Sequence, residues 1–403
     1  MPIDSAHLKV ALQEEDVATH DMEGAPDLHA LKAEIIERAH ELGFDLVRFA
    51  RAGAMPDTQR VLEERIDAGL LSGLTWFTKD RARVASDPRN LMVSAQTAMS
   101  LGISYLGNEE YTPSTPGEPR GKVARYAWGL DYHEVFKAKL TALHEFVQER
   151  LGPQVEARTL VDTARIVDRA VARQAGMGWF GKNSNILNRE RGSWILLGEL
   201  LLDVELPSDE PVRTHCGTCT RCMPACPTGA ILAPGVIDSD RCISYLTIEL
   251  KGPIPREMRS LIGDWVFGCD ICQDVCPVNR KAIPGEHPEF APDAGIGPSP
   301  VLTELLDITE EEFRVRFKTS PVKRAKWAGL RRNAAVALGN VGDPASVPAL
   351  VRALNGTSEL VRGHAAWALG KIGGEPALMA LRERFATEDD EWVKEEIRLA
   401  IES

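Results

Sequence analysis

The residues CGTCTRCMPACP at 216–227 decide the organisation of this chain, together with CDICQDVCP at 269–277. The first run spaces its cysteines as C-x2-C-x2-C-x3-C and the second as C-x2-C-x3-C, and a proline follows each run. The first spacing is that of bacterial ferredoxins, in which three thiolates hold one [4Fe–4S] cluster and the fourth crosses to the other cluster. The two runs therefore predict a ferredoxin-like iron–sulfur domain.

The crossing rule assigns all eight cysteines of the chain to two clusters. The predicted ligands of the first cluster are Cys216, Cys219, Cys222 and Cys276. The predicted ligands of the second cluster are Cys226, Cys242, Cys269 and Cys272, where Cys242 fills the one open place. The alternatives are a zinc ribbon, which better fits pairs of C-x2-C, and a disulfide framework, which requires an oxidising compartment.

Length and composition indicate a multidomain protein of the soluble class. A chain of 403 residues accommodates two or three domains. No apolar run reaches the ~20 residues of a membrane helix, and the start MPIDSAHLKV resembles no export signal. We therefore expect a cytoplasmic protein without membrane contact, which suits oxygen-sensitive clusters. The net charge of −12 means that any nucleic acid must bind to a local basic patch.

The pattern along the chain predicts a loose tail and three domains. Residues 1–26 are polar and acidic without periodicity, and 27–205 alternate strands with amphipathic helices, as in an α/β (α+β) layered domain. Residues 206–290 form the iron–sulfur domain, and 291–403 comprise a basic linker and helical repeats. The expected helices are 28–42, 133–151 and 163–175, with Asp27 as N-cap and Gly43 as terminator of the first. The expected strands are 46–50, 98–105, 123–127, 156–161 and 194–204.

An internal repeat marks the C-terminal part. RRNAAVALGNVGDPASVPALVRAL from Arg331 is echoed by RGHAAWALGKIGGEPALMALRERF from Arg362, a shift of 31 residues, and a partial third copy begins near Val393. Paired helices joined at a glycine are typical of HEAT-like repeats. An ordinary helical cap is the alternative.

Two motifs before the cysteines have competing interpretations. GMGWFG at 176–181 matches the dinucleotide fingerprint, but a helix precedes it where a strand is required, so we disfavour a nicotinamide or flavin site. Asp162 ends one predicted strand and precedes a helix, and the residues alone favour an N-cap. A carboxylate at the end of a strand also faces the usual ligand crevice, where burial would raise its pKa and make it a proton donor.

A basic block stands out near the start of the repeats. Residues 314–332 contain eight cations and Trp327. Such a block could hold phosphates while the indole stacks on a base, or it could be a solvated helix face beside an acidic neighbour. Under the first alternative, the candidate RNA-binding residues are Lys323, Arg324, Lys326, Trp327, Arg331 and Arg332.

Beyond these motifs, the chain resembles the epoxyqueuosine reductase family over about residues 27–290. The resemblance rests on the stretch from VDTARIV to LLLDVEL at 161–206, the two cysteine runs, SDPRNLM at 86–92 and GLDYHEVFKAKL at 129–140. The HEAT-like tail is similar to that of many members.

The resemblance implies a cobalamin-dependent enzyme with two clusters. Its reaction removes the oxygen of an epoxide on the cyclopentane ring of epoxyqueuosine, at the wobble position of certain tRNA anticodons, and releases it as water. By position, Asp162 matches the proton donor and the eight cysteines match the cluster ligands. Arg83 and the Lys182-Asn183-Ser184 loop match the surroundings of cofactor and substrate. The D-x-H-x-x-G corrinoid signature is absent, because Phe136 replaces its glycine.

Electron supply and rival functions complete the expectations. Iron–sulfur clusters pass electrons one at a time, whereas epoxide reduction needs two electrons. A centre that can store two electrons must therefore lie between the clusters and the substrate. We expect a monomer, supplied by an electron donor of the flavodoxin or ferredoxin type. The rivals are a cytoplasmic reductive dehalogenase-like cobalamin enzyme, a ferredoxin-like electron-transfer protein with an interaction solenoid, and a tRNA-binding scaffold with structural clusters.

Overall fold

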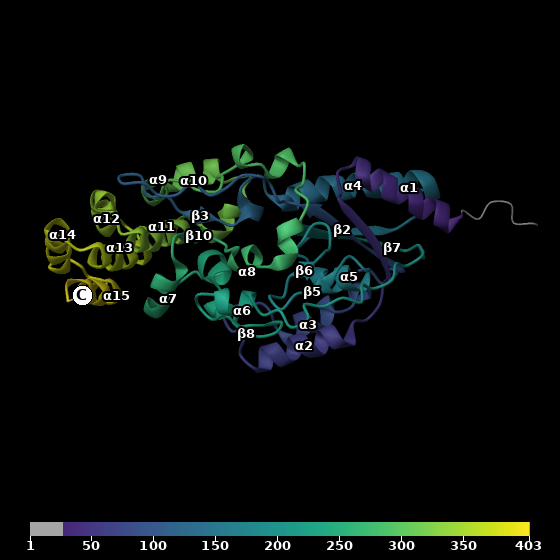
Figure 1. Cartoon of the computed structure of the whole chain (residues 1–403), viewed down its shortest axis with the longest axis horizontal. Helices are drawn as coiled ribbons and strands as arrows, with labels where there is room; N and C mark the ends of the chain where they lie inside the picture. Colours follow the sequence, from purple (N-terminus) through teal and green to yellow (C-terminus); the bar gives the residue numbers. More distant parts are fainter. Residues whose placement is uncertain (1–26, 403) are drawn as a thin grey trace, which may run out of the picture.

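The computed structural model describes residues 27–402, and the predicted tail at 1–26 lies outside them. The molecule is elongated (Figure 1). A sheet covered by helices α1 and α4 lies at one end, the cysteine-bearing segments with α6 and α8 lie in the middle, and helices α12 to α15 lie at the other end. The order of these three parts along the molecule follows their order in the sequence.

The first part contains a four-stranded sheet in the order β1-β2-β7-β4. Every neighbouring pair is antiparallel, so this layer is of the α+β type. In the register, Glu199 of the third strand lies opposite Ser100 on one side and Leu160 on the other. The strands are β1 Leu46–Arg51, β2 Thr97–Ser104, β4 Ala157–Leu160 and β7 Ile195–Leu202.

Helices α1 (Leu28–Glu41) and α4 (Tyr132–Leu151) cover one face of this sheet. As predicted, the Asp27 carboxylate caps the first helix by accepting from two backbone N–H groups. Gly198 lets the second helix approach closely, because a Cβ at this strand position would meet the Phe136 ring at 2.4 Å. The packing of these two helices leaves the opposite face for the site.

Shorter elements cover the opposite face. Helix α5 (Asp168–Gln174) packs on β2 and β7. The stretch at 176–181 leads into a hairpin of β5 (Trp179–Phe180) and β6 (Ile186–Leu187), which agrees with rejecting a dinucleotide site. Helices α2 (Pro56–Asp67) and α3 (Lys79–Ala85) lie outside α5.

Two predicted elements are wrong in extent. The helix expected at 163–175 begins only at Asp168, because residues 162–166 form turns and bends. The strand expected at 123–127 stops at Val123, where β3 (Lys122–Val123) gives way to a 3-10 turn at 125–127. Both errors follow from tertiary contacts that an apolar run does not reveal.

The middle part consists of short elements between the cysteines. Its strand β10 pairs in parallel with β3, which ties this part to the first. A π-helix at 245–249 follows Cys242. The named elements are α6 Cys222–Ala225, β8 Ile231–Ala233, β9 Val236–Ile237, α7 Arg256–Ile262, β10 Trp265–Phe267 and α8 Ile271–Asp274.

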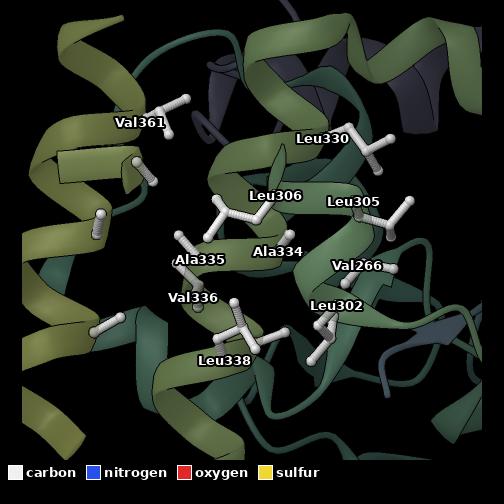
Figure 2. Packing of buried hydrophobic residues seen from close by; sticks show 14 of the residues in the cluster. Val266, Leu302, Leu305, Leu306, Leu330, Ala334, Ala335, Val336, Leu338 and Val361 are labelled. Atoms are coloured by element: carbon white, nitrogen blue, oxygen red, sulfur yellow. The ribbon is translucent and has the colours of Figure 1, made fainter. Parts of the chain in front are cut away.

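The last part is a stack of helices. Its hydrophobic core continues into the middle part. Leu302, Leu305 and Leu306 of α9 pack against α11, beside Val266 of β10 (Figure 2). A buried ion pair between Arg259 and Glu396, at 2.7 Å, joins α7 to the last helix. The helices are α9 Leu302–Asp307, α10 Glu310–Arg316, α11 Trp327–Val341, α12 Val347–Leu354, α13 Glu359–Ile372, α14 Glu375–Phe385 and α15 Glu391–Ile401.

Candidate active site

Asp162 is not a helix cap. The N-cap position of α5 is Val167, five residues later. The carboxylate of Asp162 instead accepts a hydrogen bond of 2.7 Å from the Tyr132 hydroxyl at the start of α4. About half of its side chain, 52%, is exposed, so a ligand can reach it. The cap interpretation of Asp162 is therefore wrong, and a carboxylate accessible to ligands takes its place.

Backbone strain coincides with the predicted site residues. Within residues 27–402, the non-glycine residues with positive φ are Asp162 at 38°, Ser184 at 63° and Lys326 at 66°. Each lies in a segment that the sequence singled out for cofactor, substrate or RNA. Such conformations are costly for L-residues and persist at functional sites where the surroundings hold them.

His133 connects Asp162 to a second carboxylate. Its Nδ1 lies 2.8 Å from Oδ1 of Asp131, and its Nε2 lies 3.4 Å from Oδ2 of Asp162. Desolvation opposes a charged ring, but the hydrogen bond to Asp131 and the charge of Asp162 outweigh it and raise the pKa of His133 to about 9. Desolvation likewise favours a neutral Asp162, but the hydrogen bond from Tyr132 and the charge of His133 hold its pKa below the ordinary value. At neutral pH the pair is imidazolium and carboxylate.

The basic block reaches this site through one residue. Nζ of Lys323 lies 2.7 Å from Oδ2 of the buried Asp131, which also caps α4. Arg324 is paired with Glu249, and Lys326 is exposed. The exposed cations at 323–326 therefore border the Asp162 site.

The structure corrects the rest of the block. Arg332 is fully buried and donates to the carbonyls of Leu246, Leu250 and Gly252, so it stabilises the fold and cannot contact RNA. Trp327 donates its indole N–H to the Ile308 carbonyl, and Arg331 lies over its ring at 4.7 Å. One ring face is thus already covered, which disfavours base stacking.

Arg83, a predicted cofactor residue, does not join the site. It forms an exposed ion pair with Asp80 on the outer side of α3. Two positions earlier on the same helix, Arg81 donates to the carbonyls of Thr163 and Ala164 and supports the turn after Asp162. The helical period separates the two arginines, but the sequence did not show which one faces inward.

The loop at 182–184 links the site to the cysteine segments. Nδ2 of Asn183 donates to the Cys272 carbonyl at 3.3 Å, and Nζ of Lys182 donates to the Gly217 carbonyl at 2.8 Å. Arg169 of α5 donates to the Ser184 carbonyl at 3.2 Å. Asn183 therefore contacts the second cysteine run, Ser184 contacts α5, and Lys182 contacts the first cysteine run.

Two further carboxyl groups, Glu199 and Asp168, were not identified from the sequence, and their pKa values are raised by burial and by the charge of Asp162. Glu199 is fully buried on β7, and both of its oxygens lack a hydrogen-bond partner within the described chain. Burial and then the charges of Asp168 and Asp162 raise its pKa well above the ordinary value. Burial and the charge of Asp162 raise the pKa of Asp168 to about 7. A charged residue within an apolar strand, LLGELLL, was the available signal.

The eight cysteines are free thiols, and they gather in two groups. The thiol of Cys276 interacts electrostatically with those of Cys216 and Cys219, as does the thiol of Cys222. The thiol of Cys269 interacts with those of Cys272 and Cys242, and the thiol of Cys242 with that of Cys226. The thiol of Cys272 also interacts with that of Cys222, so the two groups lie near one another.

We call Cys226, Cys242, Cys269 and Cys272 the inner group and the other four cysteines the outer group. The inner group contains the more deeply desolvated thiols. Burial raises the pKa of Cys272 to about 12 and that of Cys269 further still. In the chain from 27 to 402, no three His, Cys, Asp or Glu side chains converge closely enough for a single metal ion.

Comparison with known families divides the chain as the sequence does. Residues 215–279 match the 4Fe-4S double cluster binding domain, which includes every cysteine. Residues 86–163 match the domain described as epoxyqueuosine reductase QueG, DUF1730, and 326–402 match HEAT repeats. The predictions of an iron–sulfur domain and of HEAT-like repeats are confirmed. No helix in the described part of the chain is long and apolar enough to cross a membrane.

Curated relatives named epoxyqueuosine reductase match most of the chain. The protein of Bacillus anthracis is 35% identical over 381 residues, 93% of this chain and 98% of its own length. That of Pseudomonas aeruginosa is 40% identical over 353 residues, 86% of this chain and 96% of its own.

Solved structures of epoxyqueuosine reductase also match the fold. One holds an epoxyqueuosine-modified tRNA-Tyr stem loop, with a TM-score of 0.88, 35% identity, and coverage of 93% of this chain and 99% of that one. Another, from Bacillus subtilis, has its aspartate-bearing catalytic loop swung out of the active site, with a TM-score of 0.87, 34% identity, and coverage of 93% and 99%.

Proposed function

Because this chain belongs to the epoxyqueuosine reductase family, we propose that it reduces epoxyqueuosine to queuosine at the wobble position of tRNA anticodons, in the cytoplasm and as a monomer. The observation that carries the proposal is the contact series Lys323–Asp131–His133–Asp162. It connects exposed cations suited to phosphate with a strained, accessible carboxylate, next to the cysteine domain.

The stoichiometry of the reaction sets what the site must supply. Removing the epoxide oxygen breaks two C–O bonds, forms one C=C bond and releases water, which consumes two electrons and two protons. The first C–O cleavage leaves an oxyanion that must be protonated, and the second needs the departing hydroxyl to leave as water. The site must therefore place a proton donor and a source of electrons next to the substrate.

Asp162 is the group that we assign to proton transfer, with His133 as the group that holds the proton. The imidazolium at Nε2 faces the carboxylate oxygen, and its raised pKa keeps it loaded at neutral pH. Asp162 takes a proton from His133 and passes it to the developing oxyanion. Asp168, whose pKa is about 7, lies behind Asp162 as a further proton source.

Electrons come from two [4Fe–4S] clusters with the cysteine ligands assigned above. The inner group lies against Asn183 through the Cys272 carbonyl, so it is the one next to the site. The outer group of Cys216, Cys219, Cys222 and Cys276 receives electrons from a flavodoxin- or ferredoxin-type donor. The thiol groupings support this arrangement.

The residues near Asp162 fit cobalamin. Trp179, on the hairpin that carries Lys182–Ser184, buries an indole N–H without a partner within the described residues, and corrin amide side chains are suitable acceptors. Asn183 and Ser184 would hold the cofactor, and Asp162 would lie beside it. Bound there, cobalamin would supply a centre that collects two electrons and gives them together to carbon.

Anaerobic turnover tests this function. The protein, cobalamin, a strong chemical reductant and tRNA carrying epoxyqueuosine are incubated, and the nucleosides are analysed by mass. We expect loss of one oxygen mass, and no loss when cobalamin is omitted. Asp162→Asn should keep cluster absorbance and tRNA affinity but lose most turnover, whereas Asp80→Asn, a surface control, should be active. An unchanged epoxide with intact clusters and bound cobalamin would refute the function.

A further inference from the structure

Four exposed cations lie in the segments that carry the outer cysteine group, which is Cys216, Cys219, Cys222 and Cys276. They are Arg213, Arg221, Arg280 and Lys281, called here the cluster-loop cations. Within residues 27–402, none of their side chains forms an ion pair or a hydrogen bond. The basic block at 323–326 differs, because Lys323 and Arg324 are both paired with carboxylates. In a protein with a net charge of −12, this set is a local reversal of sign.

The segments that carry these cations are free of acids. Residues 211–237 and 275–285 contain no Asp or Glu. Because like charges in a shared patch repel one another, an uncompensated group of this kind costs folding free energy. A partner of opposite charge would recover that cost.

Specific contacts bring these segments together in space. The Arg189 guanidinium donates to the Thr214 hydroxyl, and the Ile283 N–H donates to the Glu190 carbonyl. Together with the bond from Lys182 to Gly217, these contacts join the loops at 182–190, 213–222 and 276–283. Two of these loops carry Cys276, Cys216 and Cys219, whose thiols interact electrostatically.

The outer cysteine group is the one that faces solvent. Between Cys216 and Cys222, every residue other than Cys219 is exposed. In contrast, Cys269 lies between the buried Gly268 and Asp270, and Cys272 is covered by Asn183. Electron tunnelling needs short distances, so a protein donor must approach the exposed group.

We propose that the cluster-loop cations form the docking surface for an acidic one-electron carrier protein. The inference rests on the proposed function, because that reaction is what consumes the electrons. Electron delivery at this surface can nevertheless be measured without the tRNA substrate. In each encounter the reduced carrier loses one electron and the outer cluster gains it, so two encounters serve one epoxide. Uncompensated cations accelerate such encounters by steering, and small transient interfaces suit rapid exchange.

Position in the molecule favours a protein carrier over RNA here. The cluster-loop cations lie in the segments of the outer cysteine group, which needs an electron source, whereas the ion pair of Lys323 with Asp131 lies beside the Asp162 site. Two explanations compete with this proposal. The cluster-loop cations could bind tRNA, or they could only offset the negative charge of the clusters.

The test compares two reductants on the reconstituted full-length protein. Reduced flavodoxin, an acidic one-electron carrier, is mixed anaerobically with the wild type and with Arg213→Glu/Arg280→Glu, and the appearance of its semiquinone is followed. We expect the reduction rate at low salt to fall about tenfold or more in the variant. Added salt should slow the wild type strongly and the variant little. Dithionite, a small reductant, should reduce both at the same rate.

Two controls separate this proposal from the others. Lys371→Glu/Arg382→Glu, which has the same charge change at exposed repeat residues, should keep the wild-type rate with flavodoxin. Arg213→Gln/Arg280→Gln replaces the variant if the glutamates disturb the clusters. Unchanged flavodoxin rates in a variant with intact clusters would overturn the proposal, whether or not its tRNA affinity falls. Turnover with dithionite tests the proposed reaction separately.

Discussion

Nζ of Lys323 lies 2.7 Å from Oδ2 of Asp131, although the two residues are far apart in sequence. Asp131 is nearly buried, and its other oxygen faces Nδ1 of His133. A cation outside the site and an imidazolium inside it therefore share one carboxylate. This arrangement makes the charge state of His133 depend on Asp131, which can be tested.

Replacing Asp131 with asparagine should lower the pKa of His133. Asparagine still caps α4, but it removes the carboxylate that stabilises the imidazolium. In the wild type, a pKa of about 9 keeps the ring charged at neutral pH. We expect the alkaline fall of single-turnover rate near pH 9 to move down toward ~6.5, with about a tenfold loss at pH 8.

The sign of the stability effect follows from the same shift. Because the folded pKa of His133 is raised, its contribution to the free energy of unfolding is full below about 6.5 and is lost as pH rises through about 9. Rates from pH 6 to 10 and the imidazole NMR shift measure both effects. Glu134→Gln, at an exposed acid on the same helix, should change neither. An unmoved imidazole titration in Asp131→Asn would contradict the coupling.

Arg332 should matter for stability and not for RNA contact. Its buried guanidinium satisfies three backbone carbonyls and the Asn333 side chain. Arg332→Met leaves these acceptors without partners, so we expect the free energy of unfolding to fall by about 3 kcal/mol or more. Denaturant unfolding measures this loss. Arg382→Met, at an exposed repeat position, should cost less than about 0.5 kcal/mol.

Local signals explain what the sequence predicted well. The Asp27 cap, the amphipathic helix that it starts and the cysteine spacing each depend on residues close in the chain. The HEAT-like period is local in the same sense, because each repeat packs mainly on its neighbour. These features follow from residue type and spacing.

Long-range contacts explain what the sequence did not predict. Asp162 looked like a cap, but its role depends on Tyr132 and His133 from the start of another helix. Arg331 and Arg332 are adjacent in the sequence. Arg331 lies over an indole ring, whereas Arg332 is buried and donates to backbone carbonyls. Which of Arg81 and Arg83 faces inward also depended on packing that no spacing rule encodes.

Exposed cations at 323–326 should hold RNA. Lys323→Gln/Lys326→Gln removes two charges beside the site, so tRNA affinity should fall about tenfold at low salt. The slope of log affinity against log salt should decrease in magnitude by about 2. Filter binding at several salt concentrations measures both. Arg51→Gln/Arg382→Gln, at exposed cations elsewhere, serves as control, and an unchanged slope in the first variant would exclude this segment from the RNA interface.

Cys242 should belong to the inner cluster alone. It is the cysteine outside both runs, and its thiol interacts with that of Cys226. In Cys242→Ser we expect about half of the bound iron to be lost and turnover to stop, while the outer cluster is still reduced by flavodoxin. Cys276→Ser should lose the outer cluster instead, because its thiol lies with Cys216 and Cys219. Iron analysis and the spectra of the reduced clusters distinguish the two variants. If Cys242→Ser retained both clusters, the crossing rule would fail for this chain, and the inner cluster would need another fourth ligand.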